Sequence, residues 1–217
     1  MATPVCGGLK MSPEIVLIDY GMGNLWSVRS ALDFLGKKPV ISGDPAQVVR
    51  ANALVLPGVG SFRQATEALR SSGLDEAITE AVLGRGRKIL GICLGMQLFA
   101  EYGSEDGVSQ GLGFIPGRVE RFSSEELGSL KVPHIGFNRV ISSEQSRLFR
   151  GLNAPTDFYF VHSYRLLPAG LPGQSSTCHY GVDFLAAYEH ENIFATQFHP
   201  EKSQTNGLFL LKNFLQG

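Results

Sequence analysis

Short apolar runs alternate with segments of helical periodicity through the first half of the chain. The run EIVLID (14–19) is typical of a buried strand, and apolar residues then recur at helical spacing until Gly36, which fits a helix C-cap. Asp44 and Pro45 form the start signal of another helix, as N-cap and first helical residue. Such an alternation implies a parallel sheet with helices on both faces. It predicts further strands over 38–42, 53–57 and 88–93, and helices over 62–71, 74–83 and 94–102.

The second half of the chain has a different pattern, with extended apolar runs and few helical segments between them. Only the last segment, 206–216, again shows helical spacing. We therefore expect an α/β fold, with a mostly parallel central sheet flanked by helices and an added mixed or antiparallel sheet in the C-terminal half. We expect one domain over 14–217, preceded by an N-terminal extension over 1–13. The expected strands of this half cover 118–122, 139–142, 157–167, 183–189 and 193–198.

Composition narrows the classes of function. The chain has 217 residues, 43% of them hydrophobic, and a formal net charge of −1, which suits a globular domain with a sizeable core. This balance does not favour a nucleic-acid surface, and no apolar run approaches the ~20 residues of a membrane helix. Three isolated cysteines favour a reducing cytoplasm over a disulfide framework. Neither a CxxC nor an HExxH spacing occurs, so we expect no metal and no cofactor.

The segment GICLG (91–95) places Cys93 between two glycines, after an apolar strand and before a helical pattern. The carboxyl end of a parallel strand is where open α/β sheets form their ligand sites. Glycines at 91 and 95 remove Cβ atoms that would crowd a sharp strand-to-helix turn, as in a nucleophile elbow. The start of the next helix would favour the thiolate and direct backbone amides at the group under attack. The alternative is a buried structural cysteine beside packing glycines.

A nucleophilic cysteine needs a base, and the base needs an orienting partner. His199 ends the apolar run IFATQF and is followed by Pro200, which stops the strand. Glu201 lies two residues beyond His199, so in an extended segment the two side chains share a face. The pair can then hydrogen-bond and fix the tautomer of the imidazole. The alternative is a surface turn with solvated charges.

Three motifs occur in the order typical of one enzyme family: PGVG (57–60), GICLGMQ (91–97) and QFHPEKS (197–203). On these motifs the chain resembles the class I, or triad, glutamine amidotransferases. Within that class it is most similar to the glutaminase subunits of imidazole glycerol phosphate synthase, which belongs to histidine biosynthesis. The similarity runs from about residue 14 to 215, and it includes IDYGMGN (18–24), LPGVGSF (56–62), GLGFIPGRVERF (111–122), KVPHIGFN (131–138) and FYFVHSY (158–164).

The resemblance implies a role for each matching residue. Cys93 would attack the side-chain amide of glutamine, His199 would pass the thiol proton to the leaving ammonia, and Glu201 would orient His199. Backbone amides would form an oxyanion hole, and neighbouring residues would bind the substrate. The implied oxyanion-hole residues are Leu94, Gly58 and Val59, and the implied glutamine-binding residues are Gly58, Gly60, Gln97, His162, Ser163 and Tyr164.

The resemblance also implies a partner. Glutaminases of this type pass ammonia to a separate cyclase subunit with a (β/α)₈-barrel fold, in a heterodimer. The cyclase reaction yields imidazole glycerol phosphate and an aminoimidazole carboxamide ribotide. The residues that would face the cyclase are Gly23, Asn24, Arg29, Phe137, Asn138 and Lys202. We expect neither a nucleic-acid partner nor a membrane.

One position departs from the family's pattern, because Phe137 stands where the family usually has tryptophan in the motif PHxGWN. Phenylalanine keeps an aromatic ring but has no indole N–H donor. The nearest alternative is a glutaminase that supplies ammonia to an enzyme amidating sugars of surface polysaccharides, since that branch shares the triad. Two other classes remain open: a cysteine peptidase or γ-glutamyl hydrolase on the same fold, and a non-catalytic binding subunit.

Three further residues receive structural interpretations. We expect Trp26 to pack in the core, with an interface contact as the alternative. We expect Cys178 to be a structural residue whose side chain points away from His179 on a strand. At His162 we expect the backbone, and not the ring, to contribute to the proposed glutamine site.

Overall fold

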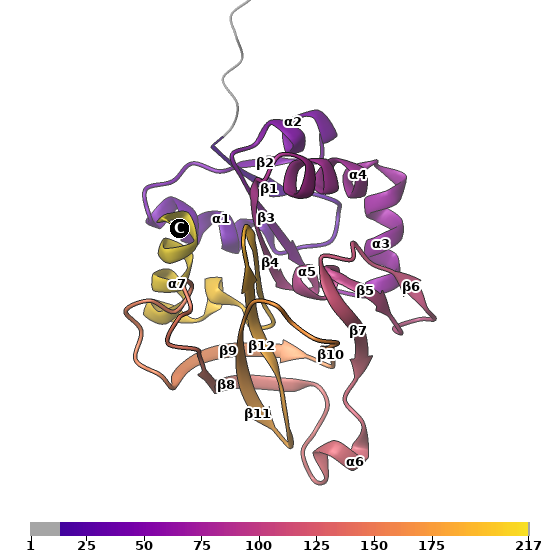
Figure 1. Cartoon of the computed structure of the whole chain (residues 1–217), viewed down its shortest axis with the longest axis vertical. Helices are drawn as coiled ribbons and strands as arrows, with labels where there is room; N and C mark the ends of the chain where they lie inside the picture. The colour runs from indigo at the N-terminus through magenta and orange to yellow at the C-terminus, as the bar shows by residue number, and fades with distance from the viewer. Residues whose placement is uncertain (1–13, 217) are drawn as a thin grey trace, which may run out of the picture.

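The computed structural model describes residues 14–216, so the extension expected over 1–13 lies outside the described residues. Within 14–216, nine strands form a large sheet in the order β2-β1-β3-β4-β13-β12-β11-β8-β9, and four more form a second sheet, β10-β7-β5-β6 (Figure 1). The first five strands of the large sheet run parallel, and the remaining pairs are antiparallel. This architecture confirms the expected fold class. Most C-terminal strands continue the parallel sheet edge to edge instead of forming a separate layer.

The strands of each sheet have the following bounds. In the large sheet they are β2 (Val40–Ser42), β1 (Ile15–Ile18), β3 (Ala53–Gly58), β4 (Lys88–Cys93), β13 (Ile193–Thr196), β12 (Val182–His190), β11 (Gln174–Tyr180), β8 (His134–Ile141) and β9 (Thr156–His162). In the second sheet they are β10 (Tyr164–Pro168), β7 (Ile115–Arg121), β5 (Ala100–Gly103) and β6 (Ser109–Gln110).

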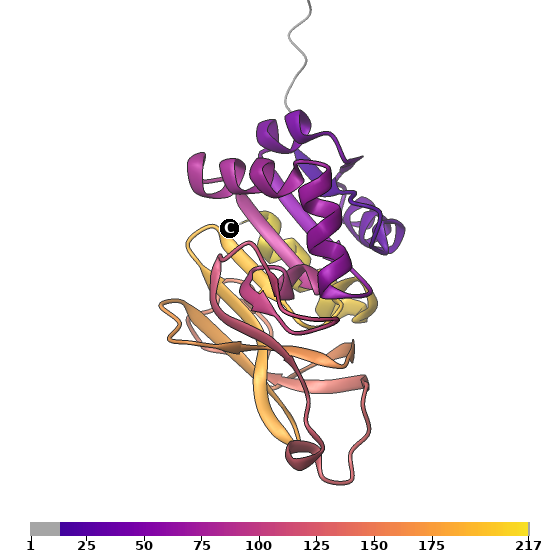
Figure 2. The ribbon, with the colours of Figure 1, turned by 90° about the vertical axis from the view of Figure 1, so that its right-hand side faces the viewer.

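Helices cover both faces of the parallel strands (Figures 1 and 2). The two buried hydrophobic clusters correspond to these faces, one beneath α2, α3 and α4 and the other beneath α1 and α7. Sequestering apolar surface on both faces is what requires the parallel strands to be apolar throughout. The helical segments are α1 (Leu25–Phe34), α2 (Pro45–Arg50), α3 (Phe62–Ser71), α4 (Leu74–Thr79), the π-helical η1 (Glu80–Gly84), α5 (Leu94–Gln97), α6 (Ser124–Leu127), the 3₁₀ turn η2 (Pro200–Lys202) and α7 (Gln204–Gln216).

The helix starts follow local sequence signals. The side chain of Asp44 accepts a hydrogen bond from Ala46 N at 2.9 Å, and Pro45 is the first residue of α2, as predicted. Asn24 caps α1 by accepting from Ser27 N at 3.3 Å. Gly36 follows α1 with φ 76°, the left-handed conformation that favours glycine at a helix end. These starts and ends are therefore set by residues close in sequence.

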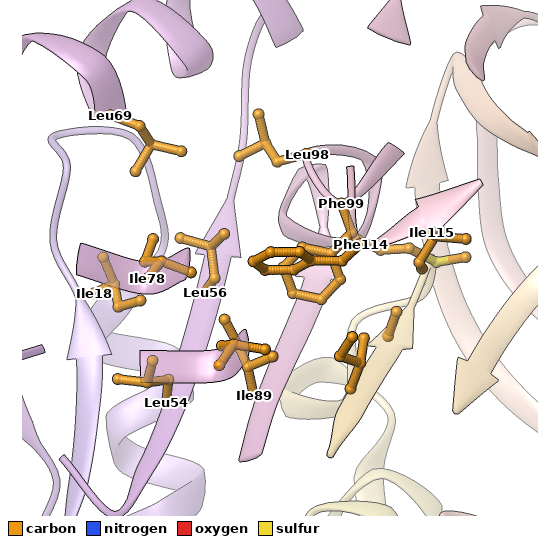
Figure 3. Close-up of a cluster of buried hydrophobic side chains, with 14 of the residues drawn as sticks. Ile18, Leu54, Leu56, Leu69, Ile78, Ile89, Leu98, Phe99, Phe114 and Ile115 are labelled. Carbon is orange, nitrogen blue, oxygen red and sulfur yellow. The ribbon is translucent and has the colours of Figure 1, made fainter. Parts of the chain in front are cut away.

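The helix predicted over 94–102 is wrong, because α5 (Leu94–Gln97) makes a single turn and β5 begins at Ala100. The carbonyl of Phe99 accepts a hydrogen bond from Ile115 N at 2.8 Å, so the second sheet satisfies this backbone group in place of a helix. The Phe99 ring packs against Phe114 with a centroid distance of 5.4 Å, and Figure 3 shows the two rings together. Tertiary pairing has overridden a local pattern that suits a helix.

The strand predicted over 157–167 is divided between the two sheets. β9 ends the large sheet, β10 lies at an edge of the second sheet, and Ser163 connects them. The carbonyl of Ser163 accepts a hydrogen bond from Phe122 N at 3.1 Å, which fixes the crossing point. Three strands, β5, β6 and β11, were not predicted, because their sequences lack a clear alternation of apolar and polar residues.

The core position expected for Trp26 is also wrong. Trp26 lies on the outer side of α1 with 69% of its surface exposed, and the guanidinium of Arg29 lies 5.4 Å from its ring centroid. Cys178 is buried on β11 and its neighbour His179 is exposed, as the alternation of side chains along a strand requires. Within residues 14–216, every helix is too short or too polar to cross a membrane.

Candidate active site

Cys93 lies at the junction of β4 and α5 in a conformation that non-glycine residues rarely adopt, with φ 55° and ψ −108°. The two flanking glycines allow strand and helix to approach. A Cβ on Gly91 would lie 2.8 Å from the carbonyl oxygen of Gly95, and a Cβ on Gly95 would lie 1.8 Å from the carbonyl oxygen of Leu56. The structure therefore has the sharp turn that the segment GICLG predicts, and the turn holds the thiol at the end of the parallel sheet.

The helix that follows Cys93 is shorter than predicted. A helix of four residues has a smaller dipole than the nine-residue helix expected from the sequence, so its effect on a thiolate is smaller too. Direct contacts of Cys93 involve other elements. Gln197 Nε2 lies 3.7 Å from the Cys93 sulfur, and the thiol lies 3.9 Å from the carbonyl oxygen of Val161 on β9.

His199 and Glu201 form the hydrogen bond that their spacing predicts, with His199 Nδ1 2.8 Å from Glu201 Oε1. Both side chains are buried. His199 has extended backbone, and the 3₁₀ turn η2, which starts at Pro200, brings the carboxylate back under the ring. Two backbone contacts fix His199: its N–H donates to Tyr159 O at 2.9 Å, and its carbonyl accepts from Ser203 Oγ at 2.6 Å.

The electrostatic environment favours the imidazolium form of His199. Burial alone would lower the pKa of the ring, but the hydrogen bonds and charges of Cys93 and Glu201 outweigh it and raise the pKa to about 10. His199 Nε2 is buried and makes no hydrogen bond of regular geometry to any residue within 14–216. Since Nδ1 is engaged by Glu201, Nε2 is the ring nitrogen available for proton exchange with Cys93.

A cavity of about 480 Å³ adjoins Cys93 and His199. Five of the six residues implied in glutamine binding line it, and the sixth, Gly58, does not. Gly58 pairs with Cys93 in the β3–β4 register, where a Cβ would lie 2.3 Å from the Tyr20 hydroxyl and 2.9 Å from Leu94 Cβ. The lining residues are Val59, Gly60, Ser61, Cys93, Leu94, Gln97, Glu105, Pro133, Val161, His162, Ser163, Tyr164, His199 and Lys202.

Sequence reasoning missed two side chains of this site. Glu105, in the loop after β5, lines the cavity and also accepts a hydrogen bond from Phe62 N at 2.9 Å, at the start of α3. Burial raises the pKa of its carboxyl group. No local signal marks Glu105, but Gln197 lies two residues before His199, and the alternation rule could have placed both on one face.

The residues implied in partner binding fall into two neighbouring groups. Phe137 and Lys202 both contact the ring of Tyr159, at 5.5 Å between ring centroids and 5.9 Å from Nζ to the centroid. Asn24 caps α1 and Arg29 lies on it. This helix packs against η2, and Trp26 and Glu201 both line a groove between the two segments. Gly23 approaches β3, where a Cβ would lie 3.3 Å from the Pro57 carbonyl oxygen. Asn138 donates to His179 O at 3.0 Å.

Comparison with known proteins agrees with this geometry. Residues 16–216 match the family model described as "Glutamine amidotransferase class-I". The chain is 48% identical over 200 residues to the "Imidazole glycerol phosphate synthase subunit HisH 1" of Campylobacter jejuni, covering 92% of this chain and 98% of that protein. It is 47% identical over 203 residues to the "Imidazole glycerol phosphate synthase subunit HisH" of Syntrophotalea carbinolica, with the same coverage of 92% and 98%.

Two solved structures share the fold at low sequence identity. The structure of PurLQS from Thermotoga maritima has a TM-score of 0.74 and 18% identity, covering 95% of this chain and 99% of that chain. The crystal structure of another glutamine amidotransferase has a TM-score of 0.71 and 18% identity, covering 94% of this chain and 97% of that chain. Together with the family match over nearly the whole sequence, these results show that the chain belongs to the class-I glutamine amidotransferase family.

Proposed function

We propose that this chain is the glutaminase subunit of an imidazole glycerol phosphate synthase, with one catalytic domain over 14–217. It hydrolyses glutamine to glutamate and ammonia with Cys93, His199 and Glu201. One observation carries the catalytic part: Cys93, in its strained turn, and His199, whose ring is hydrogen-bonded to Glu201, line a single cavity. The pathway part is supported by relatives named for that synthase, at 48% identity across almost the whole of both chains.

The chemistry proceeds in two steps. Cys93 Sγ attacks the side-chain amide carbon of glutamine while His199 holds the proton of the thiol. The tetrahedral intermediate collapses when His199 gives that proton to the amide nitrogen, so the C–N bond breaks, ammonia leaves and a thioester remains. A water molecule then attacks the thioester, His199 accepts its proton and returns it to the sulfur, and glutamate is released.

The cavity offers complementary groups for the rest of the substrate. Gln97 Nε2 is held by the Tyr164 carbonyl at 2.9 Å and by Gln197 Oε1 at 3.0 Å, which leaves Gln97 Oε1 to accept from the substrate amide. Glu105 supplies the carboxylate on the cavity wall, and it suits the α-ammonium group of glutamine. Backbone groups of Ser163 and Tyr164 would bind the same amino-acid end.

Backbone amides near Cys93 would stabilise the oxyanion. Leu94 begins α5, and Val59, in the turn after β3, lines the same cavity. Gly58 completes this group by its pairing with Cys93 in the sheet, although it does not line the cavity. Gly60 in the same turn has φ 105°, a conformation that a residue with a Cβ would strain.

The partner in this proposal is a cyclase subunit of (β/α)₈-barrel fold, bound as a heterodimer in the cytoplasm. It would cover the mouth of the cavity near Phe137, Lys202 and the start of α1. Support comes from exposed aromatic surface there, since Phe137 and Trp26 have 52% and 69% of their surface exposed. The ammonia would then pass into the cyclase, which makes imidazole glycerol phosphate and an aminoimidazole carboxamide ribotide.

A second candidate is the glutaminase of a sugar-amidating enzyme of surface polysaccharide synthesis. Phe137 in place of the usual tryptophan is the observation that favours it. The triad and the cavity are compatible with both candidates, so only the acceptor of ammonia separates them.

The deciding experiment measures glutamate release from glutamine by wild-type protein and by Cys93→Ala. Each is assayed alone and with the cyclase encoded in the same genome, with and without its ribotide ligand. We expect strong stimulation by the liganded cyclase and no release by Cys93→Ala, because the variant lacks the nucleophile. Circular dichroism and the melting temperature of Cys93→Ala serve as the control for folding.

Two results would contradict the proposal. A rate of glutamate release that does not change when the cyclase is added would favour the sugar-amidating branch. No release by wild type in any of these conditions would favour a non-catalytic binding subunit.

A further inference from the structure

Two buried histidines lie side by side beneath the glutamine cavity. His134 on β8 and His162 on β9 are direct cross-strand partners, so their side chains project from the same face of the sheet. His134 Nδ1 lies 3.1 Å from His162 Nε2, and only 2% and 6% of the two residues is exposed. A buried hydrogen bond between two ring nitrogens requires that one of them donates and the other accepts.

The neighbouring groups decide which nitrogen carries each proton. His162 Nδ1 lies 2.8 Å from the carbonyl oxygen of Tyr164, which can only accept, so Nδ1 carries the proton. His162 Nε2 must then accept, and His134 Nδ1 must donate to it. The remaining nitrogen, His134 Nε2, accepts from Asn138 Nδ2 at 3.4 Å. Asn138 is oriented for this role because its Oδ1 accepts from Arg139 N at 2.8 Å.

Both rings are neutral in this arrangement, which agrees with their surroundings. Burial lowers the pKa of His162 to about 3, although the hydrogen bond to the Tyr164 carbonyl acts in the opposite direction. Burial lowers the pKa of His134 to about 4. His134 is stacked between Phe160 and Tyr180, at centroid distances of 4.8 and 4.0 Å.

The hydrogen bonds continue from the histidines to the nucleophile. The Tyr164 carbonyl that accepts from His162 also accepts from Gln97 Nε2 at 2.9 Å. Gln97 donates its second Nε2 proton to Gln197 Oε1 at 3.0 Å, and Gln197 Nε2 lies 3.7 Å from the Cys93 sulfur. Gln97 and Gln197 are themselves buried. One chain of hydrogen bonds thus links β8, beside the exposed Phe137, with the substrate side of the cavity.

We propose that His134 and His162 are positioning residues of the glutaminase: as a pair of neutral Nδ1–H tautomers, they hold the Tyr164 carbonyl and through it the carboxamide of Gln97. This inference rests on the proposed function, because the chain ends on the residues assigned there to glutamine binding. The pair touches no substrate. It sets the direction in which Gln97 Oε1 points. Asn138 on β8 hydrogen-bonds to His134, so a change in the position of β8 would change that direction.

Packing alone does not account for the two histidines. The surrounding rings of Phe122, Phe160 and Phe184 form an aromatic cluster that apolar side chains could fill without burying polar atoms. Replacing both partners of a buried hydrogen bond with apolar groups of similar shape is close to neutral for stability. A role in packing and a role in positioning therefore predict opposite responses to two substitutions at His134.

The first test reads the tautomers directly. Two-bond ¹H–¹⁵N correlation spectra of ¹⁵N-labelled full-length protein at pH 7 distinguish protonated from unprotonated ring nitrogens. We expect both histidines to be neutral, with Nδ1 protonated and Nε2 bare. A charged ring, or a proton on Nε2 of either residue, would overturn the inference. This measurement needs no enzymatic activity, so it tests the arrangement of the pair separately from the proposed function.

The second test compares His134→Phe with His134→Gln in the complex with the cyclase. Phenylalanine keeps the stacking on Phe160 and Tyr180 but cannot donate, whereas glutamine retains a donor and an acceptor. For His134→Phe we expect KM for glutamine to rise roughly tenfold, the loss of about one hydrogen bond, with kcat changed less than threefold. For His134→Gln we expect KM within about threefold of wild type.

The control for this test is His179→Gln, an exposed histidine of the neighbouring strand whose ring pairs with Asp183 outside the chain of hydrogen bonds. We expect its KM and kcat to match those of wild type. The reverse order at His134, with His134→Phe close to wild type and His134→Gln impaired, would show that the ring is needed for packing and would overturn the proposal.

Discussion

Cys93 combines two features that a packing cysteine does not need, a strained backbone and an array of polar neighbours. A non-glycine residue at φ 55° costs on the order of 1–3 kcal/mol and persists only where the surroundings enforce it. Here the close contacts of Gly91 and Gly95 enforce it. Desolvation lowers the pKa of His199 and hydrogen bonding raises it. The carboxylate of Glu201 contributes to the net increase in that pKa. The chemistry of the site thus follows from side chains buried with their partners.

Glu201→Gln tests the contribution of that carboxylate. The amide can still accept from His199 Nδ1, but it carries no charge, so the pKa of His199 should fall and proton transfer should weaken. We expect kcat for glutamate release to fall by about 100-fold or more. The matched control is Glu125→Gln on the exposed turn of α6, which should retain wild-type activity. A Glu201→Gln variant with wild-type kcat would exclude an electrostatic role for this residue.

The two buried histidines predict how stability depends on pH. Their pKa values, about 4 for His134 and about 3 for His162, lie below the usual 6.5. Below pH 6.5 the unfolded chain therefore binds protons that the folded protein does not, and the free energy of unfolding decreases as pH falls towards 4. Each histidine contributes a slope of about 1.4 kcal/mol per pH unit in that window.

His134→Gln removes one of these slopes and keeps the hydrogen bonds. Urea unfolding at pH 7, 6, 5 and 4 should show that the free energy of unfolding falls more steeply with decreasing pH for wild type than for the variant. Carboxylates titrate in the same window in both proteins, so the difference between the proteins isolates His134. A difference that stays constant from pH 7 to 4 would mean that His134 titrates normally in the folded state.

At the level of elements, the site depends on how closely β4, α5 and β3 approach one another. Gly95 lies so near the Leu56 carbonyl oxygen that a Cβ would overlap it at 1.8 Å. Helix α5 is short because the chain enters β5 of the second sheet at Ala100. The change of sheet at Ser163 similarly brings the end of β9 and the start of β10 to the cavity wall. The ends of three strands and one helical turn thus meet at Cys93.

Gly95→Ala tests this close approach. The methyl group must displace backbone, so we expect a loss of about 3 kcal/mol or more in the free energy of unfolding, or failure to fold. Gly36→Ala provides the comparison, since Gly36 has φ 76° but open space around it and should lose only about 1–2 kcal/mol. Urea denaturation measures both. Equal losses would mean that backbone conformation, and not the contact with β3, determines the requirement for glycine.

At the scale of the whole molecule, α1 and β8 each present an exposed aromatic ring near η2, whose Lys202 lines the cavity. Phe137 and Lys202 meet on Tyr159, and Trp26 lies across the groove formed with η2. Large exposed rings beside a catalytic cavity are typical of a surface that a partner covers. The proposed cyclase interface is therefore an assembled surface, because its residues come from segments far apart in the sequence.

Phe137→Asp tests whether this surface binds the cyclase. A charge placed under the partner would remain desolvated and unpaired, so we expect the dissociation constant to rise about 30-fold or more. The control is Leu83→Asp on η1, which is 62% exposed and lies on a different element. Isothermal titration calorimetry with the cyclase measures both affinities. If Phe137→Asp binds the cyclase with unchanged affinity, the cyclase binds to another surface.

The sequence by itself determined the parallel half of the fold and pointed to the three side chains of the proposed triad. Apolar strands buried on both faces, local helix caps and the motif around Cys93 are short-range signals, so they can be recognised along the chain. The i, i+2 spacing of His199 and Glu201 is equally local.

Tertiary structure decided what depends on contacts between distant segments. The end of α5 is set by the pairing of Phe99 with Ile115, and Trp26 is exposed because the core beneath α1 is filled by other side chains. Glu105 lines the cavity, and His134 contacts His162 on the cavity wall, only because β5 pairs with β7 and β8 pairs with β9; no local pattern reports where a strand will pair.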